Sequence, residues 1–287
     1  MKEQILNAIS KYDYDIGFYL SDSNGNVISY NEDRKYESAS CIKLFILMEY
    51  FKQVWEGKKS IKDKFTYEEK DHIPGLDSGI IGKLDYGLNL TSKDYALLMI
   101  IYSDNIATNK LIEYLGIENI NKTIQEIGCK DTVLLHELDL LKYFEFGTTT
   151  PKDYAYAYEK IRTNQFINAE VCKNILEILK KQQFSDMIRK GLPPYDVLFK
   201  GDKESNICYI ASKSGSIVYT GKEMKNCRND GGIISTKYGE YIISIFISNI
   251  DDIRYDYDNK AIECGAEIGR IAYYGFMENK GVFNDSI

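Results

Sequence analysis

The apolar and polar positions of this 287-residue chain predict strands near both ends and helices between them. Alternating runs rich in β-branched and aromatic residues predict strands, and apolar residues that recur on one face of a helical period predict helices. The predicted strands cover residues 15–21, 27–30, 207–212, 231–235 and 241–248. The predicted helices cover residues 3–11, 40–51, 95–102, 106–115, 117–127, 153–162, 171–181 and 261–276.

This order of elements predicts an α/β (α+β) fold, in which one antiparallel sheet is built from both termini and flanked by helices. We expect residues 1–57 and 204–287 to form a discontinuous α/β sheet domain. Residues 58–203 are expected to form an inserted all-helical domain, with the functional site at the junction.

Local signals mark some of the boundaries. Asn24-Gly25 predicts a hairpin turn, because both residues tolerate positive φ. Thr91, with Asp94 three residues later, predicts a helix N-terminus. Pro151 after three threonines predicts the first position of another helix.

A strongly apolar run begins at Ser40-Cys41-Ile42-Lys43 and predicts a buried helix with Ser40 in its first turn. Residues three apart share a helix face, so the Lys43 amine can reach the Ser40 hydroxyl. Burial disfavours the charged amine, and a neutral amine beside a hydroxyl is a general base beside a nucleophile. The alternative is structural, because Ser is a good helix cap and Lys usually extends to water.

Two further motifs contain side chains that could act together with Ser40 and Lys43. In Ser103-Asp104-Asn105, between two predicted helices, a hydroxyl can relay a proton and an amide can hold a carbonyl. Lys213-Ser214-Gly215 ends a predicted strand, whose edge can align a substrate while the lysine holds a carboxylate. Each triplet alone is equally typical of a turn or a strand end.

Taken in order, the three motifs resemble those of the class A serine β-lactamases and their penicillin-binding relatives. The resemblance covers most of the chain and is carried by residues 39–44, 90–94, 102–109, 148–151, 211–216 and 229–234. It implies a β-lactamase/transpeptidase-like fold and a serine hydrolase that opens the β-lactam ring through an acyl-enzyme on Ser40. It implies no metal and no cofactor.

The resemblance also implies roles for single residues. Ser40 would be the acylated nucleophile and Lys43 its base or proton relay, while Ser103 would pass a proton to the departing nitrogen.

On the substrate side, the resemblance implies that Asn105 binds the substrate's amide side chain and that Lys213 and Ser214 hold its carboxylate. The backbone N–H groups of Ser40 and Ser216 would form the oxyanion hole. Gly215 lets the backbone approach closely.

One position departs from the family pattern. Class A enzymes carry a Glu on the Ω loop that activates the deacylating water, and in register with the family this position falls on Leu138. Glu137 and Asp139 flank it, and the loop is shorter than usual. Glu137 is the first candidate for the water-activating base, Asp139 the second, and a solvated loop acid is the alternative.

Composition narrows the remaining possibilities. The net charge of −7 gives no reason to expect nucleic acid or an anionic membrane as a partner. The six cysteines are widely spaced, which indicates free thiols rather than a metal knuckle or redox motif. With only His72 and His136, a Ser-His-Asp triad or a zinc site has few candidates.

The N-terminus lacks the apolar stretch of a signal peptide, and no transmembrane segment is predicted. Either the protein is cytoplasmic or a leader has been removed, and the sequence leaves both open. The expected partner is a small-molecule β-lactam or a related acyl or peptidoglycan-like substrate, bound by a monomer.

Three hypotheses follow. The first is a serine β-lactamase-like hydrolase. The second is an esterase or peptidase of the penicillin-binding type, or a slowly deacylating protein that lacks the usual Glu. The third is a module that binds β-lactams or peptidoglycan fragments without turnover.

Overall fold

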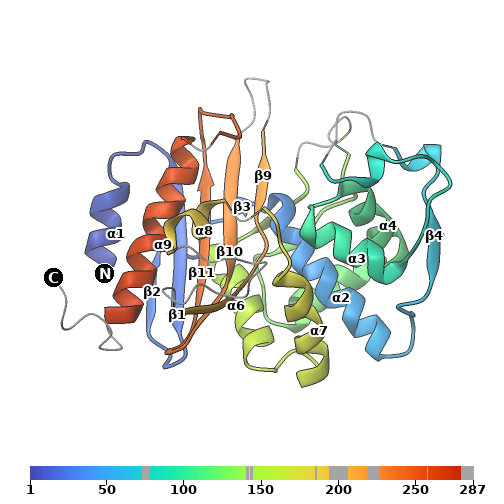
Figure 1. The fold of residues 1–287 in the computed structure, drawn as a ribbon, viewed down its shortest axis with the longest axis horizontal. Helices are drawn as coiled ribbons and strands as arrows, with labels where there is room; N and C mark the ends of the chain where they lie inside the picture. The colour runs from blue at the N-terminus through green and yellow to red at the C-terminus, as the bar shows by residue number, and fades with distance from the viewer. Residues whose placement is uncertain are drawn as a thin grey trace.

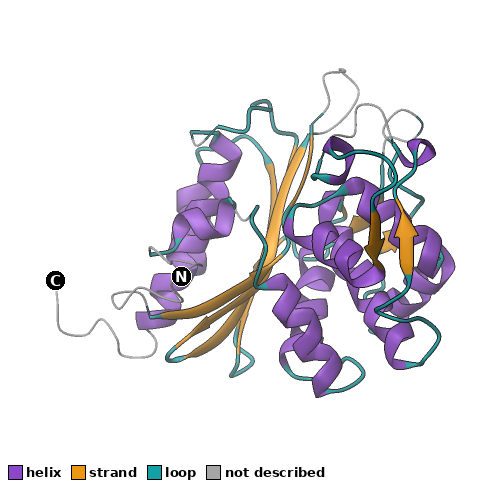
Figure 2. Cartoon of the chain, turned by 45° about the vertical axis from the view of Figure 1, so that its right-hand side comes forward, coloured by secondary structure: helices purple, strands orange, loops and turns teal. Residues whose placement is uncertain are grey.

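A computed structural model describes residues 1–72, 78–139, 142, 145–184, 186–193, 206–218, 226–256 and 258–278. Figure 1 shows the short helix α1 and the long helix α9 on one side of a sheet, and a cluster of helices on the other side. The view in Figure 2 shows the same three layers, with the strands between the two groups of helices.

The central sheet is antiparallel and is built from both ends of the chain, as predicted. Its strand order is β2-β1-β11-β10-β8, and β9 also pairs with β10. The strands are β1 (Asp15–Asp22), β2 (Val27–Tyr30), β8 (Ile207–Ser212), β9 (Gly215–Ile217), β10 (Cys227–Thr236) and β11 (Gly239–Ser248).

One face of the sheet is covered by α1 (Lys2–Ile9), α9 (Lys260–Glu278) and the short α8 (Met187–Gly191). Alternate isoleucines of the strands point into this core, because successive strand residues face opposite sides of a sheet. The opposite face carries Phe246, which packs with Tyr154 of the helical region.

The helical region surrounds α2 (Lys43–Trp55), most of whose side chains are buried. The other helices are α3 (Ser92–Ile101), α4 (Asn105–Leu115), α5 (Ile117–Glu126), α6 (Pro151–Arg162) and α7 (Ala169–Leu179). The predicted helix starts are confirmed, since Thr91 and Asp94 form a capping box and Thr150 caps a helix with Pro151 at its first position.

Several short elements were not predicted, because two or three residues carry no periodic pattern. The short strands are β3 (Tyr36–Glu37), β4 (Lys64–Thr66), β5 (Asn89–Thr91), β6 (Val133–Leu134) and β7 (Gly147–Thr149). The 3₁₀ turns are η1 (Ala39–Ile42), η2 (Glu69–Asp71) and η3 (Ile81–Lys83). Strand β3 pairs with β7, which joins the segment before Ser40 to the segment before α6.

Several predicted boundaries differ from those in the structure, and two of the differences have a clear physical reason. Ser40 lies in η1 rather than in the first α-helical turn, because Ala39 before it has a φ of 46° and only the following residues adopt α geometry. Strand β10 begins at Cys227 rather than at residue 231, because its polar first residues are buried by tertiary contacts that the alternation does not reveal.

The division into two domains stays a prediction. In the structure α2 packs against α3, α4, α5 and α7, although the predicted boundary at residue 57 assigns it to the sheet. Similarly, α8 packs against α9 and β10.

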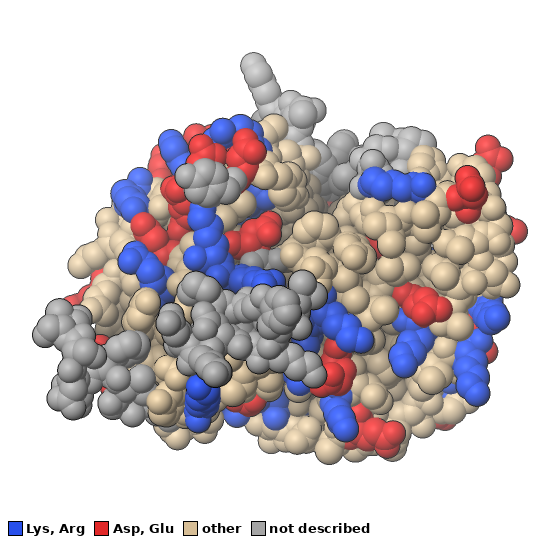
Figure 3. Space-filling view, viewed as in Figure 1, with Lys and Arg blue, Asp and Glu red and all other residues tan. Residues whose placement is uncertain are grey.

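Basic and acidic side chains are interspersed over the face shown in Figure 3. Within the described ranges, no helix combines the length and the apolar character that crossing a bilayer requires. All six cysteines are free, and five of them are buried, as the spacing predicted.

Candidate active site

Ser40 lies on the wall of a cavity of about 420 Å³, at the start of the helical region. Its neighbour Ala39 adopts a left-handed backbone conformation that non-glycine residues rarely use. Such strain is found where surrounding contacts hold a functional turn in place.

Lys43 is completely buried behind the cavity. Its Nζ donates to the backbone oxygen of Ser103 and to Asn105 Oδ1, both at 2.7 Å, and lies within hydrogen-bond distance of the Ser103 hydroxyl at 3.1 Å. Burial lowers the pKa of Lys43 well below its usual value, and the nearby charge of Lys213 lowers it further. The amine is thus suited to accept a proton, and it is held by the second motif.

Lys213 approaches the same hydroxyl from the sheet. Its Nζ donates to Ser103 Oγ at 3.2 Å, and burial lowers the pKa of Lys213 to about 8. Ser103 Oγ therefore lies between two amines, each able to exchange a proton with it.

The Ser103-Asp104-Asn105 turn is fixed by Asp104. This buried carboxylate accepts hydrogen bonds from the N–H groups of Ile80 and Ile81, both at 2.8 Å, and caps α4 through the N–H of Ala107 at 2.9 Å. These contacts hold Ser103 at a φ of 52°. The sequence analysis gave Asp104 no role, although an Asp before a helix is a typical N-cap.

The third motif places strand β9 directly against the nucleophile turn. A Cβ atom at Gly215 would lie 2.7 Å from the backbone nitrogens of both Ser40 and Cys41. Only glycine permits this approach. The backbone oxygen of Lys213 accepts a hydrogen bond from the buried Tyr154 hydroxyl at 2.6 Å, which fixes the end of β8.

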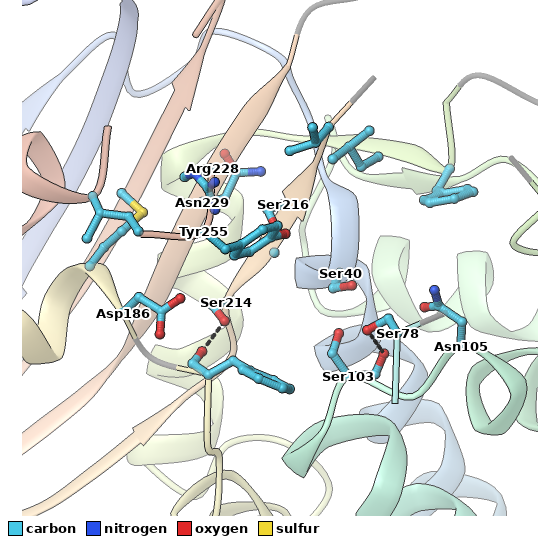
Figure 4. Close-up of a pocket in the computed structure, with 17 residues that line it drawn as sticks. Ser40, Ser78, Ser103, Asn105, Asp186, Ser214, Ser216, Arg228, Asn229 and Tyr255 are labelled. Carbon is cyan, nitrogen blue, oxygen red and sulfur yellow. Dashed lines mark hydrogen bonds between the residues drawn. The ribbon is translucent and has the colours of Figure 1, made fainter. Parts of the chain in front are cut away.

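Figure 4 shows the two sides of the cavity facing each other. Ser40, Ser103 and Asn105 come from the helical region, and Ser214, Gly215 and Ser216 come from the strand edge. Ser214 Oγ donates to the backbone oxygen of Phe184, and Ser216 Oγ shares a hydrogen bond with the Tyr255 hydroxyl. The structure therefore brings all three motifs together around one cavity.

The two acids expected near the deacylating water lie elsewhere. Glu137 and Asp139 line a second hollow with Leu138, Asn109 and Lys110, and none of residues 137–139 lines the Ser40 cavity. The geometry gives Glu137 no support as the water-activating base, because its side chain is exposed and lines the second hollow rather than the Ser40 cavity.

Leu138 of this loop packs against the nucleophile turn. It is 1 % exposed and belongs to an apolar cluster with Ala39, Phe146, Ile217 and Cys227. The side chain of Asn109 fixes its backbone twice, accepting from Leu138 N at 2.8 Å and donating to Leu138 O at 2.9 Å.

The family model for the β-lactamase enzyme family matches residues 1–276. The chain belongs to this family. It is 29% identical over 211 residues to the β-lactamase SME-1 of Serratia marcescens, covering 70% of this chain and 69% of that protein.

Among solved structures, the β-lactamase of Sphaerobacter thermophilus superimposes with a TM-score of 0.80 at 26% identity, covering 98% of this chain and 97% of that one. PBP-A superimposes with a TM-score of 0.80 at 24% identity, covering 96% of each chain. A point mutant of PBP-A is described as an acyl-enzyme complex with penicillin G. At that identity, the likeness to PBP-A shows the fold alone.

Several residues that line the Ser40 cavity carry no signal in the sequence, among them the polar Asp186, Arg228 and Tyr255. Arg228 is buried, donates to the backbone oxygen of Arg254 at 2.6 Å, and stacks on the ring of Tyr255 at 4.2 Å. Asp186 faces the cavity near Ser214 (Figure 4). No local pattern marks these residues, because they reach the cavity only through the packing of distant segments.

Proposed function

We propose that Ser40 is the residue of this serine β-lactamase-like hydrolase that a β-lactam acylates, and that the acyl-enzyme is hydrolysed slowly. Membership of the family supports the hydrolase and its acyl-enzyme route in general. The observation that carries the slow second step is Leu138, an apolar side chain packed where the loop meets the nucleophile turn.

In the proposed acylation, Ser40 Oγ attacks the lactam carbonyl carbon and its proton passes to the neutral Lys43 amine. The carbon–nitrogen bond then breaks, Ser103 gives its proton to the nitrogen, and Lys43 returns a proton to Ser103. The contacts of Lys43 and Ser103 at 3.1 Å and the lowered pKa of Lys43 support this route.

The other motif residues would bind the substrate. Lys213, Ser214 and Gly215 would align a carboxylate and the strand edge, and Asn105 would bind the amide side chain. The backbone N–H groups of Ser40 and Ser216 would stabilise the oxyanion. The closeness of β9 to the nucleophile turn supports this geometry, since a Cβ atom at Gly215 would lie 2.7 Å from Ser40 N.

Deacylation requires a base that removes a proton from water as it attacks the ester. Positioned general bases typically contribute about 10²–10⁴ in rate, and Leu138 carries no such group. We therefore expect the acyl-enzyme to accumulate.

An intact-mass time course after mixing with penicillin G tests the proposal. A mass increase equal to the whole penicillin, persistent for minutes and absent in Ser40→Ala, is expected. Nitrocefin turnover by the wild type should be slow and should vanish in Ser40→Ala. Equal turnover by both proteins, or no adduct and no turnover, would overturn the proposal.

The second candidate is an esterase or peptidase of the penicillin-binding type, which acts on another acyl substrate. The same apolar Leu138 favours it, because a long-lived lactam adduct is compatible with fast turnover of a different ester. Ser40-dependent hydrolysis of a thioester, faster than that of nitrocefin, would select this candidate, and any Ser40-dependent hydrolysis argues against a pure binding module. The monomeric state stays a prediction.

A further inference from the structure

Glu37 lies three residues before Ser40 and connects the nucleophile turn to the end of the neighbouring loop. Its Oε1 accepts a hydrogen bond from the N–H of Ala39 at 3.0 Å and another from the N–H of Phe146 at 3.3 Å. One carboxylate oxygen therefore holds two segments that are far apart in sequence and adjacent in space.

Both held segments border the catalytic cavity. Ala39 is the strained residue that directly precedes Ser40, with a φ of 46°. Phe146 lines the cavity and packs with Leu138 and Ala39 in one apolar cluster. A change at Glu37 is therefore expected to displace Ser40 through Ala39 and the apolar wall of the cavity through Phe146.

The surroundings fix the backbone of Glu37 as well. Strand β3, which contains it, pairs with β7, and the N–H of Ser38 donates to the oxygen of Gly147 at 2.9 Å. The side-chain amide of Asn229, which lines the cavity, donates to the backbone oxygen of Glu37 at 2.8 Å.

Three buried polar atoms in this region lack a hydrogen-bond partner among the described residues: Glu37 Oε2, Ser38 Oγ and Asn229 Oδ1. Buried polar groups are normally paired, and unpaired ones need an explanation beyond packing. An apolar side chain would avoid this penalty at position 37, which argues that the carboxyl group serves the reaction.

We propose that Glu37 is a positioning residue for acyl transfer, whose carboxylate holds Ala39 and Phe146 so that Ser40 keeps its attacking position. The inference rests on the proposed function of Ser40. Glu37 itself does not line the cavity and touches no reacting atom.

The arrangement makes acylation sensitive to the protonation of Glu37. Burial raises the pKa of Glu37 to about 7, partly offset by the N–H groups of Ala39 and Phe146, with Glu145 adding repulsion. Cys227 and the His136 ring, which stacks edge-on with Phe146, are the other titratable groups nearby. Hydrogen bonds to a carboxylate are stronger than those to a neutral carboxyl group, so acylation should slow as pH falls through this range.

The test is the acylation rate by penicillin G, followed by intact mass from about pH 5 to about pH 9. Glu37→Gln keeps an oxygen acceptor without the titration. It should acylate within about threefold of the wild type at pH 8 and should lose the inflection near pH 7, leaving the titrations of the two buried lysines, Lys43 and Lys213. Glu37→Leu removes the acceptor and should acylate about tenfold more slowly or worse, since each charge-assisted hydrogen bond is worth about that factor.

Glu145→Gln is the matched control. It removes a nearby exposed charge without altering the Glu37 carboxylate that holds Ala39 and Phe146, and it should keep the inflection. His136→Gln controls for the histidine in the same way. An unchanged inflection in Glu37→Gln, or its loss in His136→Gln, would overturn the proposal.

Hydrogen exchange of residues 37–41 and 145–147 separates this inference from the function itself. Glu37→Leu should accelerate exchange in both segments without any substrate. If no β-lactam acylates Ser40 but exchange rises as expected, the positioning of both segments by Glu37 is supported and the assigned function is wrong. If exchange is unchanged in a folded Glu37→Leu protein, Glu37 does not hold the two segments, and the inference is wrong whatever the substrate is.

Discussion

Leu138→Glu places a carboxyl group on the loop beside the nucleophile turn. Leu138 is 1 % exposed and packs against Ala39 and Phe146, and Asn109 fixes its backbone on both sides. A glutamate side chain at this position would start from a fixed backbone and lie against Ala39, the residue before the acylated serine. If general-base help is the missing component, deacylation should accelerate by about 10²–10⁴.

The same substitution destabilises the fold, and the two effects can be weighed. Removing the buried leucine loses about 2–3 kcal/mol of apolar burial. Burying a neutral carboxyl group costs about 1–3 kcal/mol more, and its pKa rises because burial disfavours the charge. The total of about 3–6 kcal/mol is a large part of a typical stability of about 5–15 kcal/mol. The variant should fold with a lowered melting temperature and should deacylate faster as pH rises.

The assay follows decay of the penicillin adduct by intact mass after free penicillin is removed. Leu138→Gln is the matched control, because it has nearly the same shape and polarity but cannot act as a base. Equal decay in Leu138→Gln and Leu138→Glu would refute the reasoning, since polarity alone would then explain the change. Rapid decay in the wild type that is lost in Glu137→Gln would instead restore Glu137 as the base.

Three further predictions concern residues that hold the backbone around the site in place. Gly215→Ala should slow acylation about 10–100-fold, because its Cβ would lie 2.7 Å from backbone nitrogens that cannot rotate away; a rate within twofold of the wild type would contradict this. Asp104→Ala should destabilise the fold by about 3 kcal/mol in a denaturant titration, since three N–H groups lose their acceptor; a loss below about 1 kcal/mol would show that water replaces the carboxylate. Glu37 has a folded pKa of about 7 against a reference of 4.5. The fold therefore favours the protonated form of Glu37. Its contribution to the free energy of unfolding is fully present below the reference pKa and is lost as pH rises through about 7. The melting temperature of Glu37→Gln minus that of the wild type should be near zero at about pH 4.5 and about 5–10 °C at about pH 8; a difference independent of pH would contradict the raised pKa.

The sequence predicted those parts of the fold that local pattern controls. Strands β2 and β8 begin and end where expected, because their alternation stops at polar or turn-forming residues. The start of α2 was misplaced, because the positive φ of Ala39 depends on contacts with Phe146, about a hundred residues away. The buried polar start of β10 was missed for the same reason.

In the candidate site, too, the residues marked by a local pattern were predicted and those placed by tertiary packing were not. The three motifs were found because each is contiguous, and the structure brings them to one cavity. Arg228 and Asp186 were missed because only tertiary packing places them there. Glu137 and Leu138 are adjacent in sequence, and nothing local tells which of the two side chains faces the nucleophile turn.

Two buried ionisable groups, Lys213 beside Ser103 and Asp230 on β10, argue for function on energetic grounds. Lowering the pKa of Lys213 from 10.5 to about 8 corresponds to about 3 kcal/mol of lost stability at neutral pH, and raising that of Asp230 from 3.8 to about 7 corresponds to about 4 kcal/mol. Together these costs are comparable to the net stability of a typical domain, and apolar side chains would avoid them. The fold keeps both amines, Lys43 and Lys213, on one hydroxyl while it packs an apolar residue, Leu138, against Ala39 of the nucleophile turn. Under the proposed function, selection for acylation without selection for rapid deacylation would account for both features.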